Sequence, residues 1–197
     1  NAGYPEAYLV KVEALRYLHL SESKVKVGMV SARVPTKGAL RLLVLADYLI
    51  SNTQLQMNLL VQAFPALPAG TIITVKPHPS CPIHLNDYPS LRMTVTMEPI
   101  AKLLDECNVA YSSAVTSAAV DAFCARVPIV SVLDPKTLNL SPLRGCEGVL
   151  FASTPEKLAA GLASAATTQR TRDDRNEFFT LDPELPRWRK LILDSLA

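Results

Sequence analysis

Residues 109–133 read VAYSSAVTSAAVDAFCARVPIVSVL, and they contain two short apolar runs separated by a longer segment. The runs at 109–112 and 128–133 have the length and composition of strands, whereas residues 114–125 predict a helix. Both runs are continuously apolar rather than alternating, which is typical of strands covered on both faces of a sheet. This stretch therefore predicts one strand–helix–strand unit of a parallel sheet.

The same alternation of short strands and helices continues on both sides of this unit. We expect helices at residues 5–20, 39–50, 55–64, 99–107, 155–166 and 187–196, and strands at 25–34, 71–76, 92–97 and 149–152. Thr154 is the expected N-cap of the helix at 155–166. The repeated order predicts an α/β fold with a doubly wound, mostly parallel sheet, in which ligands bind beyond the carboxyl ends of the strands.

The composition is that of one ordinary globular domain. The chain has 197 residues, of which 49% are apolar and 19% are charged, so it can form a full core and is not a disordered chain. Its net charge of +2 is too small for a protein that binds nucleic acid by neutralising phosphates. The sequence shows neither an apolar run long enough to span a bilayer nor a secretory signal, and we expect a cytoplasmic protein.

Cysteine and glycine patterns argue against two common kinds of site. The four cysteines are Cys81, Cys107, Cys124 and Cys146. They form no CxxC pair, so we expect reduced, buried thiols rather than a zinc site or a disulfide framework. Neither GxGxxG nor GxxxxGK[ST] is present as a phosphate-binding loop. His78, Cys81 and His84 are close in sequence, but prolines interrupt them and no fourth ligand is near, so we expect no metal and no cofactor.

The motif Lys76-Pro77-His78-Pro79 stands at the carboxyl end of the predicted strand 71–76. Lys76 and His78 are two residues apart, so their side chains can point the same way and donate hydrogen bonds to an anion. The two prolines stiffen the segment and lower the entropic cost of holding His78 in place. The competing interpretation is that His78 is a structural residue of the core.

A second polar cluster lies where the strand at 109–112 passes into the predicted helix. Ser113 is a natural N-cap there, and the unpaired amides of a first helical turn can bind phosphate. Ser112 and Thr116 add hydroxyl groups to the cluster. Simple capping of the helix is the competing interpretation, and for Asp121, two turns later, the competing interpretation is a solvated helix face.

Together these motifs resemble the C-terminal, donor-binding domain of glycosyltransferases built from two Rossmann-like domains, the GT-B architecture. The similarity is greatest to bacterial enzymes of surface-polysaccharide synthesis, namely sialyltransferases, polysialyltransferases, Kdo transferases and glycerophosphotransferases. His78-Pro79 matches the His-Pro motif of the sialyltransferases, and Ser112-Ser113 matches their paired serine/threonine motif. The resemblance is carried by residues 76–133, and it extends over residues 25–166 in architecture.

A third matching position is Asp121, which stands five residues before Arg126-Val127-Pro128. Many GT-B enzymes have an acidic residue at this spacing before Gly-x-Pro, and it holds the ribose of the donor. Two departures are visible here. Arg126 replaces the usual glycine, and aspartate replaces the commoner glutamate at position 121.

The resemblance implies a domain that binds a nucleotide-sugar donor, with CMP as the first choice of nucleotide and UDP as the second. The acceptor would be lipid-linked or a polysaccharide in lipopolysaccharide or capsule assembly, at the periphery of the inner membrane. No metal or cofactor is implied, and His78 would be catalytic by stabilising the leaving phosphate. The implied nucleotide-binding residues are Lys76, His78, Pro79, Ser112, Ser113, Thr116 and Asp121. Two alternatives remain open: a UDP-sugar 2-epimerase-like domain, and a non-catalytic nucleotide- or sugar-binding module.

The expected domain division is a linker helix at 1–24, a Rossmann-like nucleotide-sugar-binding domain at 25–180 and a C-terminal helix at 181–197. The chain begins without an initiator methionine, so we expect a piece of a larger protein. The general base of GT-B enzymes lies in an N-terminal domain that residues 1–24 are too few to form. We therefore expect that domain to be missing and this fragment alone to be inactive. The terminal helices would then contact the missing domain or form a homodimer.

Overall fold

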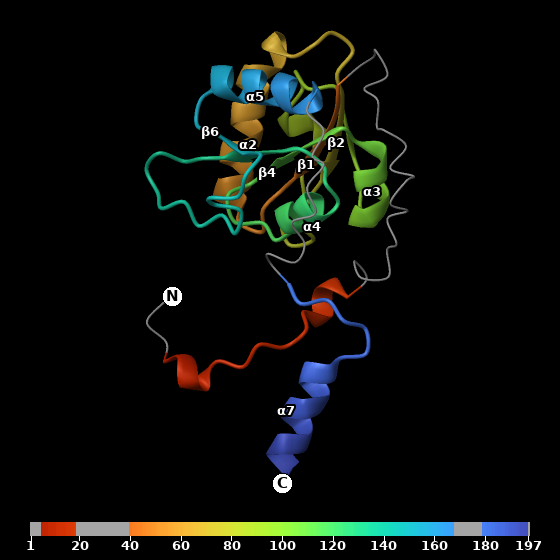
Figure 1. Cartoon of the computed structure of the whole chain (residues 1–197). Helices are drawn as coiled ribbons and strands as arrows, with labels where there is room; N and C mark the ends of the chain where they lie inside the picture. Colours follow the sequence, from red (N-terminus) through yellow and green to blue (C-terminus); the bar gives the residue numbers. More distant parts are fainter. Residues whose placement is uncertain (1–4, 19–39, 168–178, 197) are drawn as a thin grey trace. The chain divides into compact units, whose positions relative to one another are not determined.

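The computed structural model describes residues 5–18, 40–167 and 179–196 (Figure 1). The chain divides into two compact units, one formed by residues 33–172 and the other by the terminal segments 1–32 and 173–197. The strand expected at 25–34 lies outside the described residues. Within those residues, no helix combines the length and the apolar character needed to cross a bilayer.

A six-stranded sheet forms the centre of the described part of the larger unit, and every neighbouring pair of strands is parallel. The strands are β1 (Arg41–Leu45), β2 (Ile72–Lys76), β3 (Met93–Val95), β4 (Val109–Ser112), β5 (Ile129–Val132) and β6 (Val149–Ala152). Their order across the sheet is β3-β2-β1-β4-β5-β6. This is the strand order of the Rossmann fold, and its connections reverse direction between β1 and β4.

Helices cover both faces of this sheet (Figure 1). They are α2 (Ile50–Ala63), α3 (Ile100–Glu106), α4 (Ala118–Cys124) and α5 (Pro155–Thr167), with 3-10 turns η3 (Phe64–Ala66) and η4 (Leu85–Asp87). α2 packs against α5 on one face, and α3 packs against α4 on the other. The predicted α/β fold with a doubly wound parallel sheet is therefore confirmed.

Most of the predicted elements of this unit are confirmed within a few residues. They are the strands expected at 71–76, 92–97, 109–112, 128–133 and 149–152 and the helices expected at 55–64, 99–107 and 155–166. The cap of α5 is confirmed as well, because the backbone N–H of Lys157 donates to Thr154 Oγ1 at 3.3 Å.

The helix predicted at residues 39–50 is wrong, because this segment contains β1, the strand between β2 and β4 in the sheet. The run LRLLVLA is apolar at every position but one, and such a run has neither a helical nor an alternating period. Its leucines are good helix formers, which favoured the wrong assignment. β1 is buried on both faces and needs apolar side chains in both directions.

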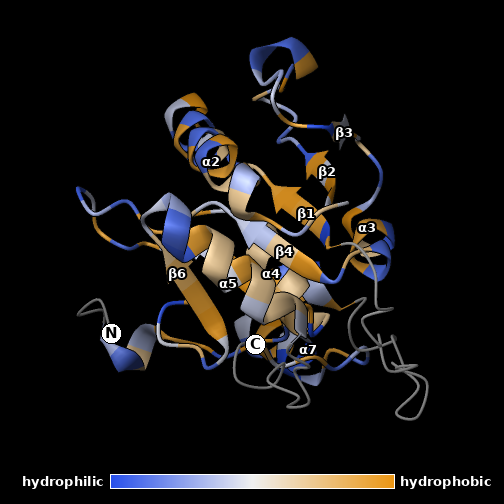
Figure 2. Cartoon of the chain, turned by 90° about the horizontal axis from the view of Figure 1, so that it is seen from above, coloured by the Kyte–Doolittle hydropathy of each residue, from blue (hydrophilic) through white to orange (hydrophobic). Residues whose placement is uncertain are grey.

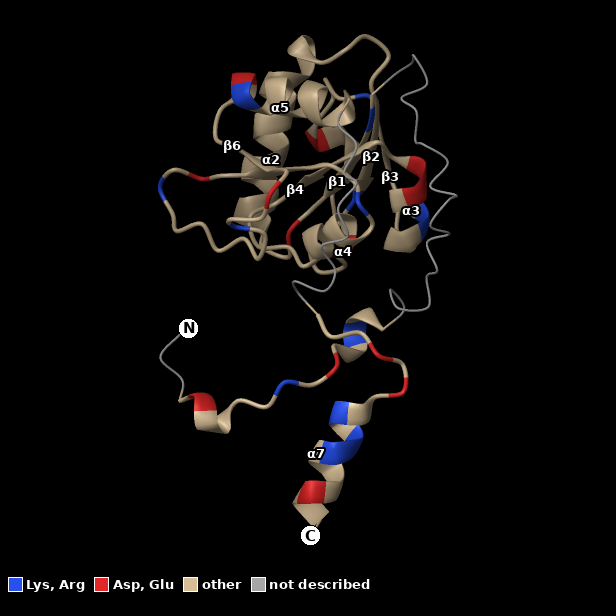
Figure 3. Ribbon diagram, viewed as in Figure 1, with Lys and Arg blue, Asp and Glu red and all other residues tan. Residues whose placement is uncertain are grey.

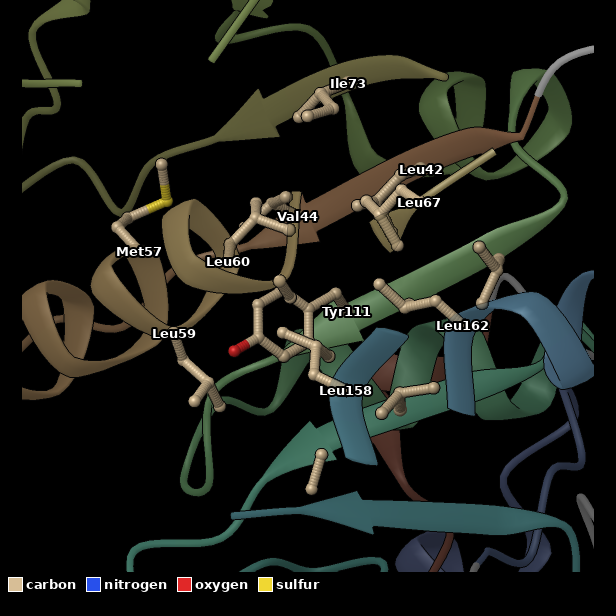
Figure 4. Packing of buried hydrophobic residues seen from close by; sticks show 14 of the residues in the cluster. Leu42, Val44, Met57, Leu59, Leu60, Leu67, Ile73, Tyr111, Leu158 and Leu162 are labelled. Atoms are coloured by element: carbon tan, nitrogen blue, oxygen red, sulfur yellow. The ribbon is translucent and has the colours of Figure 1, made fainter. Parts of the chain in front are cut away.

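A hydrophobic core lies between the sheet and the α2–α5 pair, and it buries one face of β1 (Figure 4). Leu42 and Val44 of β1 and Tyr111 of β4 point into this core, where they meet Leu60 of α2 and Leu162 of α5. All five side chains are almost completely buried. Figure 2 shows the strands in hydrophobic colours along most of their length, in contrast to the mixed colours of α2 and α3.

The smaller unit is built from the two ends of the chain, and it corrects the helix predicted at residues 5–20. Its N-terminal segment contains two 3-10 turns, η1 (Glu6–Tyr8) and η2 (Leu15–Tyr17), and no α-helix within the described residues. The backbone N–H of Ala14 donates to the Thr180 carbonyl at 3.0 Å, so this hydrogen bond goes to another segment. The predicted C-terminal helix is confirmed as α7 (Pro186–Leu196).

Glu13 joins the N-terminal segment to the first turn of α7. Its carboxyl oxygens accept hydrogen bonds from the backbone N–H groups of Arg187 and Trp188 at 3.2 and 3.1 Å. The indole N–H of Trp188 donates to the Glu13 carbonyl at 2.8 Å. Tyr17 stacks on Phe179 with ring centroids 4.1 Å apart. A residue far away in sequence thus satisfies the amides at the start of α7.

The Glu13 contact makes the smaller unit sensitive to acid. Burial raises the pKa of Glu13, but hydrogen bonds from its own backbone, Arg187 and Trp188, together with the charge of Arg187, lower it overall below its ordinary value of 4.5. The ionised Glu13 carboxylate therefore stabilises the folded smaller unit. Its contribution to stability is fully present above about pH 4.5 and is lost as the pH falls through the lowered folded-state pKa. We expect the fluorescence of Trp188, the only tryptophan of the chain, to change over that acidic range.

The control for this titration is Glu184→Gln, because Glu184 is an exposed carboxyl group of the same unit. That variant should keep the acidic transition of the Trp188 fluorescence. Glu13→Gln should remove it, since an amide does not titrate. An unchanged transition in Glu13→Gln would show that another group causes it.

Candidate functional site

The carboxyl ends of β1, β2 and β4 are adjacent, because the parallel strands end at one edge of the sheet. Leu45 at the end of β1 is paired in register with Lys76 at the end of β2 and Ser112 at the end of β4. The connections diverge between β1 and β4, so a crevice is expected at this point of a doubly wound sheet. The two predicted motifs therefore flank the end of β1.

Asp47, directly after β1, is the centre of a buried hydrogen-bond network at this edge. Its Oδ2 atom accepts the hydroxyl of Ser113 at 2.6 Å and the side-chain amide of Asn52 at 3.1 Å. Its Oδ1 atom accepts the backbone N–H of Leu49 at 3.0 Å, and its own N–H donates to Thr53 Oγ1 at 3.2 Å. Asp47 thus ties the end of β4 to the beginning of α2.

Gln56 of α2 links the ends of β1 and β4. Its side-chain amide donates to the carbonyls of Leu45 and Tyr111 at 3.2 and 3.1 Å. The hydroxyl of Tyr111 donates back to the Gln56 carbonyl at 3.1 Å, and burial raises the pKa of Tyr111 well above its ordinary value. Gln56 and Tyr111 are completely buried, so they fix the edge of the sheet rather than face solvent.

Ser112 and Ser113 are buried rather than open to a crevice. The prediction that Ser113 is the N-cap of the following helix is wrong, because α4 begins at Ala118 with Ser117 as the preceding residue. The hydroxyl of Ser113 is directed to Asp47 instead. The hydroxyl oxygen of Ser112 is buried and has no hydrogen-bond partner among the described residues.

Thr116 lies in the connection between β4 and α4, and Asp121 lies within α4. Thr116 is half-buried, and its hydroxyl oxygen accepts the N–H of Ala118 at 3.4 Å. Asp121 lies in α4 and is 8% exposed, so the expectation of a solvated helix face is wrong. Arg126 has a φ of +60°, in the left-handed region that favours glycine, so a glycine at this position would fit without strain.

Lys76 and His78 differ in their surroundings. The Lys76 ammonium donates to the Glu98 carbonyl at 2.7 Å and to the Met97 carbonyl at 3.5 Å, so it fastens β2 to the segment after β3. Pro77 is buried, which anchors the start of the loop, whereas His78 and Pro79 are exposed. The structural interpretation of His78 as a core residue is therefore wrong.

Two neighbours contact the exposed imidazole of His78. Its Nδ1 atom lies 2.7 Å from Ser80 Oγ and accepts the backbone N–H of Ser80 at 3.2 Å. Tyr48, at the end of β1, meets the ring edge-to-face at a centroid distance of 6.1 Å and an interplanar angle of 64°. Tyr48 is itself 53% exposed, so an aromatic ring and an imidazole are accessible side by side at the ends of β1 and β2.

Figure 3 shows Lys and Arg as isolated positions on the larger unit rather than as a continuous basic stripe. The cysteines all lie in the described part of the chain and carry free thiols, and Cys146 is half-buried whereas the other three are buried. Cys81 is buried, whereas His78 and His84 are exposed. Over residues 5–18, 40–167 and 179–196, no group of three His, Cys, Asp or Glu side chains is arranged to hold a metal ion.

Sequence reasoning missed Asp47, Tyr48 and Gln56. Asp47 and Tyr48 stand in the segment 39–50, for which the sequence predicts a helix instead of β1, whereas Gln56 stands in a helix that the sequence predicts correctly. The available signal was the acidic residue directly after the apolar run 42–46. Had that run been predicted as a strand, Asp47 and Tyr48 would have stood at a carboxyl end, like Lys76 and His78.

The structure is similar to solved structures of sugar-processing enzymes. The UDP-GlcNAc 2-epimerase of Methanocaldococcus jannaschii, solved with UDP-GlcNAc and UDP, matches 100% of this chain and 57% of its own with a TM-score of 0.60 and 13% identity. The glycosyltransferase SnogD of Streptomyces nogalater matches 79% of this chain and 44% of its own, with a TM-score of 0.51 and 19% identity. The glycosyltransferase of kitacinnamycin matches 68% of this chain and 36% of its own, with a TM-score of 0.50 and 18% identity.

These similarities show a Rossmann-like α/β fold shared with GT-B glycosyltransferases and a 2-epimerase. The chain spans between 36% and 57% of the length of these structures. No protein-family model matches the sequence, and no curated protein matches it.

Proposed function

We propose that residues 33–172 bind the nucleotide-sugar donor of a GT-B glycosyltransferase, with a CMP-sugar as the donor. The observation that carries the proposal is the accessible His78–Tyr48 pair beside the β1–β4 switch point. The exposed His-Pro motif at this edge of the sheet resembles that of the sialyltransferases and supports the choice of CMP. The paired serines are buried, and Ser113 contributes through its hydrogen bond to Asp47. A surface polysaccharide or its lipid-linked precursor is the acceptor class that this resemblance favours.

In the proposed reaction, an acceptor hydroxyl attacks the anomeric carbon of the donor. A bond forms between the acceptor oxygen and that carbon, and the bond from the carbon to the nucleotide phosphate breaks. The hydroxyl proton passes to a base in the second domain of the complete enzyme. His78 donates a hydrogen bond to the leaving phosphate and stabilises its growing negative charge. Lys76 contributes as a fixed positive charge, because its ammonium is already hydrogen-bonded to carbonyl oxygens.

A second candidate is the nucleotide-binding domain of a UDP-sugar 2-epimerase. The match to the M. jannaschii enzyme extends over the whole chain with a TM-score of 0.60, above the values for the two glycosyltransferases. This candidate would bind a uridine nucleotide with the same fold and the same edge of the sheet. The nucleotide preference therefore separates the two functions.

The test is a calorimetric titration of the full chain with CMP, CDP, UMP and UDP in the presence of EDTA. We expect cytidine nucleotides to bind best and without a divalent ion. Preference for UMP and UDP would favour the epimerase-like function. Binding that requires a divalent ion, or no binding at millimolar nucleotide, would refute the proposed site.

His78→Ala should weaken nucleotide binding about tenfold to a hundredfold, because a charge-assisted hydrogen bond contributes about 1.5–3 kcal/mol. The melting temperature should stay close to that of the unchanged chain, since the imidazole is exposed. His84→Ala is the matched control, because His84 is an exposed histidine of the same connection between β2 and β3. Equal affinities for the two variants would show that His78 does not contact the nucleotide.

A further inference from the structure

The contacts of His78 determine which ring nitrogen carries the proton. The backbone N–H of Ser80 can only donate, and it lies 3.2 Å from Nδ1 of His78. Nδ1 must therefore be an acceptor without a proton of its own. A neutral imidazole with an unprotonated Nδ1 carries its proton on Nε2. The hydroxyl of Ser80, 2.7 Å from Nδ1, can donate to the same lone pair.

The Nε2 side of the ring is available to a ligand. The imidazole is exposed, and its hydrogen bonds within the described residues are those that Nδ1 makes with Ser80. Tyr48 contacts the ring from the neighbouring strand end and restricts its rotation. Ser80 and Tyr48 thus constrain the imidazole from two segments, those that follow β2 and β1.

We propose that Ser80 and Tyr48 are positioning residues that hold His78 as a neutral Nε2–H donor facing an anionic phosphate oxygen. The identity of the ligand in this inference rests on the proposed function. The tautomer rests on the contacts between His78 and Ser80. An N–H donor stabilises a phosphate oxygen as its negative charge increases. A general base would need a lone pair on the outward nitrogen, so His78 does not take the proton of the acceptor hydroxyl.

The tautomer is tested by nitrogen NMR of the full chain labelled with ¹⁵N-histidine. The chain has three histidines, and the His78 signals are those lost in His78→Ala. In the neutral imidazole we expect a protonated Nε2 and an unprotonated Nδ1. Addition of CMP should shift the Nε2 resonance more than the Nδ1 resonance. A protonated Nδ1 in the neutral ring would overturn the inference even if nucleotide binds.

The positioning role is tested by Ser80→Ala and Tyr48→Ala, with Ser90→Ala as the control because Ser90 is exposed in the same connection. We expect Ser80→Ala to weaken CMP binding about twofold to tenfold, the effect of one neutral hydrogen bond. The tautomer of His78 should stay the same, because the backbone N–H at position 80 still donates to Nδ1. Tyr48→Ala should weaken binding and broaden the His78 signals, and Tyr48→Phe should restore both.

Two outcomes separate this inference from the proposed function. If CMP binds the unchanged chain, Ser80→Ala and Tyr48→Ala with equal affinity, the positioning role is overturned and the proposed function stands. If none of the four nucleotides binds although the NMR signals show Nε2–H, the proposed function is overturned. The assignment of a phosphate as the ligand of His78 is then overturned as well, whereas the tautomer stands.

Discussion

Replacing Asp47 with alanine should lower the free energy of unfolding of the larger unit by about 3 kcal/mol. The side chain is completely buried and accepts hydrogen bonds from Ser113, Asn52 and Leu49. Alanine would leave the buried hydroxyl of Ser113, beside the end of β4, without its acceptor, and an unpaired buried donor costs about 1–3 kcal/mol. The part-buried donors of Leu49 and Asn52 at the start of α2 would lose the same acceptor. The value follows from urea denaturation monitored by circular dichroism, because Trp188 lies in the smaller unit.

The control for this variant is Asp134→Ala. Asp134 follows β5 at the same edge of the sheet, is half-buried and accepts the backbone N–H of Lys136 at 2.9 Å. Its removal should cost less than about 1 kcal/mol, since the released amide is exposed to water. If both variants lost equal stability, the Asp47 network would not be what holds the β1 and β4 ends together.

Leu43→Ala should also destabilise the larger unit, by about 3 kcal/mol, within the range of about 2–5 kcal/mol for a buried leucine. Leu43 is 1% exposed and lies on the α3 face of β1, where it lines a small cavity with Leu103. Leu42 and Val44 point to the opposite face. A large loss at Leu43 would therefore demonstrate that β1 is buried on both sides.

Ile72→Ala is the matched control for Leu43→Ala, because Ile72 lies on the neighbouring strand β2 and is 49% exposed. It should cost about 1 kcal/mol or less, since much of its side chain already contacts water. The same urea titration measures both variants. A loss at Leu43 no greater than at Ile72 would contradict the packing of β1 between two helical layers.

The sequence was sufficient to predict the part of the fold whose strands are short and bounded by polar or proline residues. Residues 109–133 are the best example, because serines and Pro128 mark the limits of β4 and β5. β1 could not be assigned in the same way. Its leucines continue without a polar boundary, and a fully buried strand has no periodicity that distinguishes it from a buried helix.

The candidate site was predictable only in part. Lys76 and His78 were placed correctly at a strand end, but their different surroundings depend on the carbonyls of Met97 and Glu98. The role of Ser113 was predicted from its neighbours in sequence, whereas its partner Asp47 is 66 residues away. Glu13 likewise meets α7 across 174 residues. Local patterns carry no information on such pairs.

The position of β1 between β2 and β4 has a consequence for the kinetics of folding. β2 is the next strand after β1 in the chain, whereas β4 comes two strands later. The pairing of β1 with β4 therefore closes a long loop, as the hydrogen bond between Arg41 and Asn108 shows, because these residues are 67 positions apart in sequence. Closing a loop costs entropy before its contacts stabilise it, so folding is slowed by non-local parallel pairing. The β1–β4 contact is therefore expected to form late, and until then each half of the sheet exposes an unpaired apolar edge.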